Sequence, residues 1–134
     1  MLYEHYPQLD ARLLSYPGAR RDYQPVWMWD RYLVADRMYA GLLYIGAHKD
    51  PRYANHPFLS IKIDPAEGAF YRAQYPDTVL PGYYSDKRTW VSIRLDGSLP
   101  EAELAALCRR SYDLVVAKLP RAKRPAAPDP DRKS

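Results

Sequence analysis

The chain has 134 residues, of which 47% are hydrophobic, so it suits one globular domain with a single core. It contains no run of about eighteen apolar residues and no basic segment followed by an apolar block at its N-terminus, so we expect neither a membrane-spanning helix nor a signal peptide. The single cysteine, Cys108, excludes an internal disulfide and favours a cytoplasmic location, and a net charge of +4 does not by itself indicate binding to nucleic acid.

The N-terminal segment contains the signals of one short helix. Pro7 suits the first turn of a helix, and Leu9 and Leu13 lie four residues apart, which places them on one helical face. Tyr16-Pro17-Gly18 ends this pattern, because proline cannot continue a helix and glycine tolerates left-handed backbone geometry. We therefore predict a helix over about residues 7–15.

A β-hairpin is predicted next. Residues 19–25 are polar and end in proline, which indicates a loop. Residues 26–34 and 38–45 are rich in aromatic and β-branched side chains, which favour strands, and Ala35-Asp36 lies between them. Gly41, inside the second run, indicates a bulge or the close approach of another group.

A third strand is predicted over residues 58–63, after a loop over residues 46–57 that contains two prolines and two histidines. Side chains alternate between the two faces of a strand. Leu59, Ile61 and Ile63 are therefore expected to face the core, whereas Phe58, Ser60 and Lys62 face the other way.

The signals of a second helix follow directly. Asp64 is expected to cap it, Pro65 to take its first position and Glu67 to reach back toward the cap. This helix is predicted to extend to about Tyr75. A loop over residues 79–85 then carries the pair Tyr83-Tyr84.

The clearest strand pattern covers residues 89–95, where the side chains alternate strictly. One face of the strand carries the mainly apolar side chains of Thr89, Val91, Ile93 and Leu95, and the other face carries those of Arg88, Trp90, Ser92 and Arg94. One face of this strand is therefore expected to be buried, while the other presents guanidinium groups around an indole.

The last helix is predicted to begin at a capping box, Ser98 to Glu101, and to end at Pro120. Its apolar side chains recur at helical spacing from Leu104 to Leu119, so one face is buried. We therefore assign residues 1–119 to the domain and residues 120–134 to a basic, proline-rich tail that we expect to be disordered. Residues 121–134 carry five Lys or Arg and two Asp, so the domain itself has a net charge of only +1.

Several segments of the chain resemble the MmcQ/YjbR family of small bacterial proteins. The resemblance covers most of the chain from Ser15 to Leu119 and depends on the order and spacing of its segments. The segments are Ser15-Tyr16-Pro17-Gly18-Ala19, residues 34–43, Ser60-Ile61-Lys62-Ile63-Asp64-Pro65, Asp86-Lys87-Arg88-Thr89-Trp90, Leu95-Asp96-Gly97-Ser98-Leu99-Pro100 and Ser111-Tyr112-Asp113-Leu114-Val115.

The resemblance implies an α+β fold of the CyaY-like (frataxin-like) type, an antiparallel sheet with helices packed on one face. It also implies a DNA-binding protein with a double-wing arrangement. Family members usually have a longer first helix than Pro7 allows here, and residues 26–29 are more aromatic than the resemblance leads us to expect.

The predicted helices can cover only one face of the sheet, so we expect the other face to be partly open. Cations there would attract phosphate, and an exposed aromatic ring could stack on bases. The predicted nucleic-acid-binding residues are Lys62, Lys87, Arg88, Trp90, Arg94 and Tyr84.

Two other interpretations of the same face stay open. Trp90 and Phe58 could form a small secondary core with arginines extending over them, or the exposed aromatic side chains could form a homodimer or bind a protein partner.

The sequence indicates no catalytic or metal site, so we expect a protein without enzymatic activity and without a cofactor. It lacks a glycine-rich phosphate loop and a Gly-x-Ser-x-Gly elbow, and His5, His48 and His56 have no second ligand at metal spacing. Cys108 lies on the apolar face of the last helix and is expected to be an inert thiol.

Overall fold

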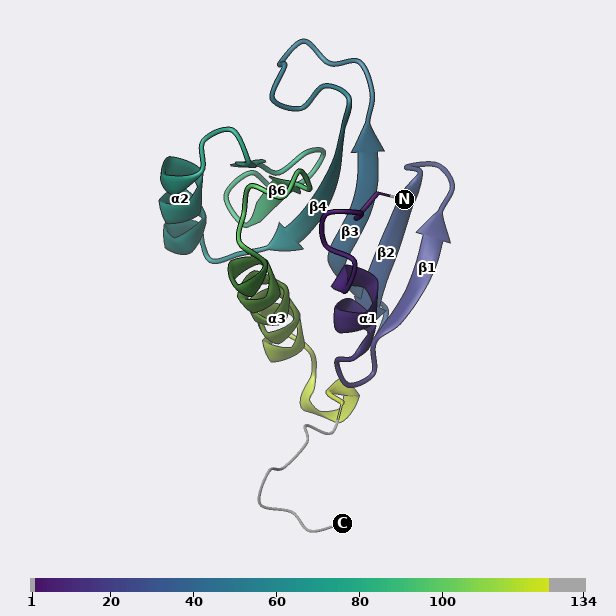
Figure 1. Cartoon of the computed structure of the whole chain (residues 1–134). Helices are drawn as coiled ribbons and strands as arrows, with labels where there is room; N and C mark the ends of the chain where they lie inside the picture. Colours follow the sequence, from purple (N-terminus) through teal and green to yellow (C-terminus); the bar gives the residue numbers. More distant parts are fainter. Residues whose placement is uncertain (1, 126–134) are drawn as a thin grey trace.

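The fold is an α+β arrangement in which three helices cover one face of an antiparallel sheet (Figure 1). The computed structural model describes residues 2–125, and within that range six strands form one sheet in the order β1-β2-β3-β4-β6-β5. The strands are β1 (Arg20–Gln24), β2 (Trp29–Val34), β3 (Arg37–Ile45), β4 (His56–Lys62), β5 (Val79–Pro81) and β6 (Trp90–Arg94). The helices are α1 (Leu9–Leu14), α2 (Pro65–Gln74) and α3 (Glu101–Ala117), followed by the short 3-10 helix η1 (Arg121–Lys123).

The main core lies between the helices and the sheet. Leu59, Ile61 and Ile63 are buried there, as their alternation predicted, together with Val91 and Ile93 of β6. α1 contributes Leu9 and Leu13, and α3 contributes the face that includes Leu104, Leu107, Cys108 and Val115. Burial of this apolar surface holds the helices on one face of the sheet.

The hairpin between β2 and β3 confirms the prediction around Ala35-Asp36. Both residues have positive φ angles, 46° and 63°, as expected for a two-residue hairpin turn that matches the twist of its strands. Gly41 marks a close approach, because a Cβ there would lie 2.6 Å from the Trp29 ring.

Three predictions at the edges of the sheet are wrong. Residues 20–24, predicted as loop, form β1, a mostly exposed edge strand paired with β2. Residues 26–28, predicted as strand, form the turn between these strands, and Met28 has a φ of 61°. Pro25 lacks a backbone donor, so a turn suits this segment better than a strand does. β5 is a second missed edge strand, only three residues long and ended by Pro81.

The N-terminal caps of α2 and α3 differ from each other. Asp64 caps α2, since its side chain accepts from the Ala66 amide at 3.2 Å, and Pro65 takes the first position as predicted. Glu67 does not reach back to the cap, because it forms an ion pair with Arg110 of α3. The predicted capping box of α3 is also wrong. Pro100 is the N-cap and has no capping side chain, and Ser98 instead donates its amide to Asp96 Oδ1 at 2.9 Å.

The second face of the sheet, which was expected to be partly open, is largely covered by loops. Phe58, Ser60 and Ser92 are fully buried. Phe58 belongs to a second apolar cluster with Trp29, Leu43, Ile45, Tyr53 and Leu80. A secondary core therefore exists, but Phe58 packs there with Tyr53 and not with Trp90.

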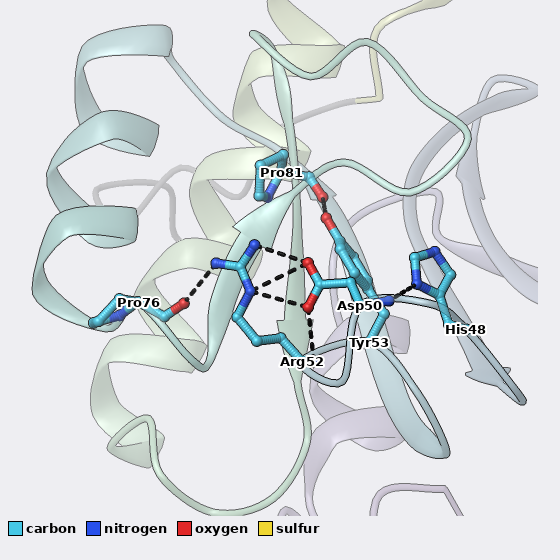
Figure 2. A network of polar contacts seen from close by, with 6 residues as sticks. All are labelled: His48, Asp50, Arg52, Tyr53, Pro76 and Pro81. Atoms are coloured by element: carbon cyan, nitrogen blue, oxygen red, sulfur yellow. Dashed lines mark hydrogen bonds and ion pairs between the residues drawn. The ribbon is translucent and has the colours of Figure 1, made fainter.

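Polar contacts attach the loop before β4 to the β5 edge of the sheet (Figure 2). Tyr53 donates its hydroxyl to the Pro81 carbonyl at 2.7 Å, and Arg52 reaches the Pro76 carbonyl at 3.4 Å. Asp50 accepts from Arg52 at 2.9 Å, while its own amide donates to His48 Nδ1 at 2.9 Å. These bonds hold the Tyr53 ring over Phe58, with the ring centroids 5.7 Å apart.

The chain after α3 has defined structure as far as Pro125. Residues 121–123 form η1, and the Arg124 guanidinium donates to the carbonyls of Leu119 and Ala117, both at 3.0 Å. The first part of the expected tail is therefore ordered, and residues 126–134 lie outside the described residues. No helix among residues 2–125 is long and apolar enough to cross a membrane.

Candidate nucleic-acid interface

Three cations and an indole surround one cleft at the end of the sheet. The cleft lies where β3 begins, β4 ends and β6 begins, beside the last turn of α3, and its volume is about 260 Å³. We call it the Trp90 cleft, and its polar and aromatic lining consists of Arg37, Lys62, Lys118 and Trp90. Arg37 and Lys118 are exposed, whereas Lys62 and Trp90 are half-buried.

Strand pairing places Lys62 beside Trp90. The two residues are register partners across β4 and β6, and Lys62 Nζ lies 5.6 Å from the centroid of the indole ring. This is within the range at which an ammonium group is attracted to an aromatic face.

Ser111 of α3 fixes the end of β4 in place. Its buried hydroxyl accepts from the Lys62 amide at 2.8 Å and donates to the Tyr39 carbonyl at 2.6 Å. One side chain therefore ties α3 to both β3 and β4 next to the cleft.

The cations of the Trp90 cleft are not neutralised by carboxylates. Arg37, Lys62 and Lys118 form no ion pair within residues 2–125, although the exposed Asp86 acts on Lys62 from a distance. Burial and the positive charge of Lys118 lower the pKa of Lys62 below its usual 10.5. Like charges are thus gathered around a partly desolvated site, which favours an anionic ligand.

Most arginines elsewhere in the described structure are held by acidic partners. Arg31 donates to both oxygens of Asp22, at 2.7 and 2.8 Å, and Arg109 pairs with Asp113 at 3.1 Å. Other examples are Arg12 with Glu101, Arg20 with Asp36, Arg21 with Asp10, Arg52 with Asp50 and Arg110 with Glu67. The contrast singles out the Trp90 cleft as a site able to receive phosphate.

The predicted site residues do not all lie together in the structure. Lys62 and Trp90 come together as described. Lys87 and Arg88 lie in the exposed turn before β6, not in the strand itself, and Lys87 donates to the Gly82 carbonyl at 3.0 Å. Tyr84 projects into solvent from the preceding loop and is 87% exposed.

Arg94 does not continue a cationic row along β6. Its guanidinium donates to Asp96 at 2.7 Å, and the side chain is only 19% exposed. Ser92, between Arg94 and Trp90, is buried and accepts from the Tyr83 amide at 3.0 Å. The continuous basic aromatic face expected from the alternation is therefore reduced to the Trp90 end.

Among residues 2–125, no cluster of three or more His, Cys, Asp or Glu side chains is placed to hold a metal ion. Burial raises the pKa of the Cys108 thiol to about 12, as suits an inert core residue.

Comparison with known proteins gives the family of the chain. Residues 14–114 match the YjbR family. The chain belongs to the YjbR family. A curated relative, the uncharacterized protein YjbR of Escherichia coli K12, is 30% identical over 118 residues, which cover 85% of this chain and 92% of the relative. The uncharacterized protein YbdF of Escherichia coli O157:H7 is 35% identical over 60 residues, which cover 45% of this chain and 48% of the relative.

Two solved structures share the YjbR-family fold described above. The crystal structure of Deinococcus radiodurans protein DR2400, a DUF419 domain, is 26% identical with a TM-score of 0.74, and the match covers 100% of this chain and 99% of that one. A Pseudomonas syringae crystal structure, target PsR293, is 19% identical with a TM-score of 0.66, and the match covers 81% and 97% of the two chains.

Sequence reasoning missed two cations of the cleft in this YjbR-family protein. Arg37 follows the hairpin turn, and Lys118 follows the last turn of α3. Each is an ordinary charged residue in its own segment, and only the packing of α3 against β3 and β4 brings them to Trp90. A sequence signal existed for Arg37 alone, since it lies in a segment that carries the family resemblance.

Proposed function

We propose that this protein binds DNA and that the Trp90 cleft receives backbone phosphates. The observation that supports this most directly is the group of three cations without carboxylate partners around a half-buried indole. Phosphate contacts supply most of the sequence-independent affinity of DNA-binding proteins, because neutralising phosphates releases condensed counterions.

Further unpaired cations lie next to the cleft along the chain. Lys87 and Arg88 precede Trp90, and both are exposed. After Lys118, the exposed residues Arg121, Lys123 and Arg124 follow in and beside η1. These exposed cations could add contacts to phosphates, although the domain as a whole is nearly neutral.

Within this proposal, Trp90 supplies an aromatic surface for a sugar or a base, and the cations supply charge. The protein acts by binding and needs neither a reaction nor a cofactor. Its place of action is the cytoplasm, which its one buried, unpaired cysteine supports.

The proposal extends to the CyaY-like (frataxin-like) fold and the double-wing arrangement implied by the family resemblance. Packing of α1 and α3, from opposite ends of the domain, on one face of an antiparallel sheet supports the classification. Superposition of residues 2–125 on a frataxin tests it, and a different strand order in the aligned sheets would contradict it.

Fluorescence anisotropy with a labelled duplex of about 20 bp tests DNA binding at several salt concentrations between about 50 and 200 mM. The triple variant Arg37→Ala/Lys62→Ala/Lys118→Ala should bind more weakly than the natural protein. Its slope of log affinity against log salt should be shallower, by roughly 0.9 for each phosphate that the variant no longer neutralises.

The matched control is Arg12→Ala/Arg20→Ala/Arg109→Ala, which removes the same charge from cations that already have acidic partners. The control should keep most of the affinity and the natural slope. Absence of duplex binding at the lowest salt, or equal losses in the two variants, would contradict the proposed function.

A further inference from the structure

A second concave site lies on the sheet face opposite the helices, between the β1–β2 turn and the loop before β6. Its volume is about 370 Å³, within the usual range for ligand sites, and none of its lining residues is charged. We call it the aromatic groove, and its principal lining residues are Trp27, Trp29, Met38, Tyr44, Tyr83 and Tyr84.

The groove has a fixed floor and exposed walls. Trp29 is 5% exposed, and its ring rests against the Gly41 backbone, where there is no room for a Cβ. Trp27 stands edge-on to Trp29 with ring centroids 5.7 Å apart and is 54% exposed. Tyr84 forms the other wall, its centroid 4.4 Å from that of Tyr83.

Backbone strain is stored at both walls. Met28, next to Trp27, has a φ of 61°, and Tyr84 has a φ of 53°. Residues with a side chain rarely adopt positive φ, and such strain concentrates at binding sites. The aromatic side chains at these two walls, Trp27 and Tyr84, are both more than half exposed.

The aromatic groove adjoins the Trp90 cleft, because Met38 lines both. An uncharged row of aromatic rings thus lies next to a cluster of unpaired cations. Proteins that bind single strands combine these two features, since cations follow the phosphates and aromatic rings stack on successive bases. The base faces of a duplex are stacked on each other, so a duplex could use the cations but not the rings.

We propose that the aromatic groove stacks the unpaired bases of a single-stranded nucleic acid whose phosphates lie in the Trp90 cleft. This inference rests on the proposed function and specifies the form of nucleic acid. The charge of the adjoining cleft complements the phosphates, which is why a nucleic-acid strand is favoured over an uncharged occupant. A second copy of the chain is the competing occupant, because Trp, Tyr and Met are also enriched in protein interfaces.

The test compares a labelled oligothymidine of about 15 nucleotides with a duplex of the same length by fluorescence anisotropy at low salt. The natural protein should bind the oligothymidine about tenfold more tightly than the duplex. The variant Trp27→Ala/Tyr84→Ala should bind the single strand more weakly, by roughly 5- to 150-fold for each base that loses its aromatic ring, and should keep its affinity for the duplex.

Both substituted side chains are at least half exposed, so the variant should fold. The matched control is Phe70→Ala, which removes a 60% exposed aromatic ring from α2, outside the groove, and should change neither affinity. Sedimentation velocity of the natural protein and the groove variant completes the set.

The outcomes separate the two proposals. If the groove variant keeps its single-strand affinity while the cleft variant loses affinity for both ligands, the stacking inference is wrong and the proposed function stands. If neither ligand binds at low salt, both are wrong. A dimer that dissociates in the groove variant, with unchanged single-strand affinity, would assign the groove to a contact between copies and overturn the inference.

Discussion

Among single residues, Ser111 links α3 to two strands through one hydroxyl. Its hydroxyl is fully buried and satisfies the amide of Lys62 and the carbonyl of Tyr39. Removing it takes this partner from the part-buried Lys62 amide and the buried Tyr39 carbonyl, and a buried group without a partner typically costs about 1 to 3 kcal/mol. Among the described residues, no other side chain forms a hydrogen bond with either group.

We therefore expect Ser111→Ala to lower the free energy of unfolding by about 2 kcal/mol. Urea denaturation measures this, with Ser98→Ala as the control, because Ser98 is exposed and its side chain caps no helix. A change within about 0.5 kcal/mol in Ser111→Ala would show that water replaces the hydroxyl.

Residues also mark where prediction from the sequence succeeds and fails. Alternation correctly placed Lys62 and Trp90 on one side, and the register makes them neighbours. It could not show that Asp96, two residues along the chain, neutralises Arg94. The alternation also could not show that Arg37 and Lys118 lie near Trp90. It describes the two faces of one strand and not the helix end that packs beside that strand.

At the scale of elements, the loop before β4 decides what the second sheet face exposes. Tyr53 covers Phe58. Its hydroxyl donates to the Pro81 carbonyl, which links the loop to β5 (Figure 2). Truncating this ring removes both the cover and the bond.

Tyr53→Ala should therefore destabilise the protein by about 3 kcal/mol, whereas Tyr53→Phe loses only the hydrogen bond, worth about 1 kcal/mol. Thermal and urea unfolding measure both variants. Tyr84→Ala, which truncates an 87% exposed tyrosine, should stay within about 0.5 kcal/mol. Equal effects for the Ala and Phe variants of Tyr53 would mean that the ring does not seal the second core.

Central elements were easier to predict than edge elements. β4 and β6 alternate because one face is buried by the helices, and α3 shows an apolar stripe for the same reason. β1 has charged residues on both faces, and β5 is too short to show a period. Residues 26–28 of the turn were mistaken for strand because apolar side chains among them line a groove and do not fill the core.

At the scale of the whole molecule, buried tyrosines couple stability to alkaline pH. Burial raises the pKa of Tyr16, Tyr32 and Tyr39 above the usual 10.0, so the folded protein keeps these phenols neutral. In the unfolded chain they ionise near that usual value. Their contribution to stability is therefore complete below about pH 10 and is lost as the pH rises from there toward the folded-state values.

Urea unfolding at about pH 9 and pH 11 measures this loss. We expect the unfolding midpoint to fall at the higher pH, with little change in the slope of the transition. Tyr39→Phe should reduce the fall, because it removes one of the coupled phenols, although it also removes the bond to the Leu13 carbonyl. A midpoint that is equal at the two pH values would contradict the assigned burial of these hydroxyls.

The distribution of charge across the molecule carries the functional proposal. Carboxylates hold most arginines of the described domain, whereas Arg37, Lys62 and Lys118 lack carboxylate partners and lie together around Trp90. This arrangement depends on the tertiary fold, so net charge and composition could not reveal it.

Mapping where DNA contacts the protein tests this account most directly. Backbone amide shifts should be followed by NMR while a duplex of about 20 bp is added at low salt. The largest changes should occur at Arg37, Lys62, Trp90 and Lys118. Changes centred on the paired cations Arg12 and Arg109, or no changes at all, would contradict it.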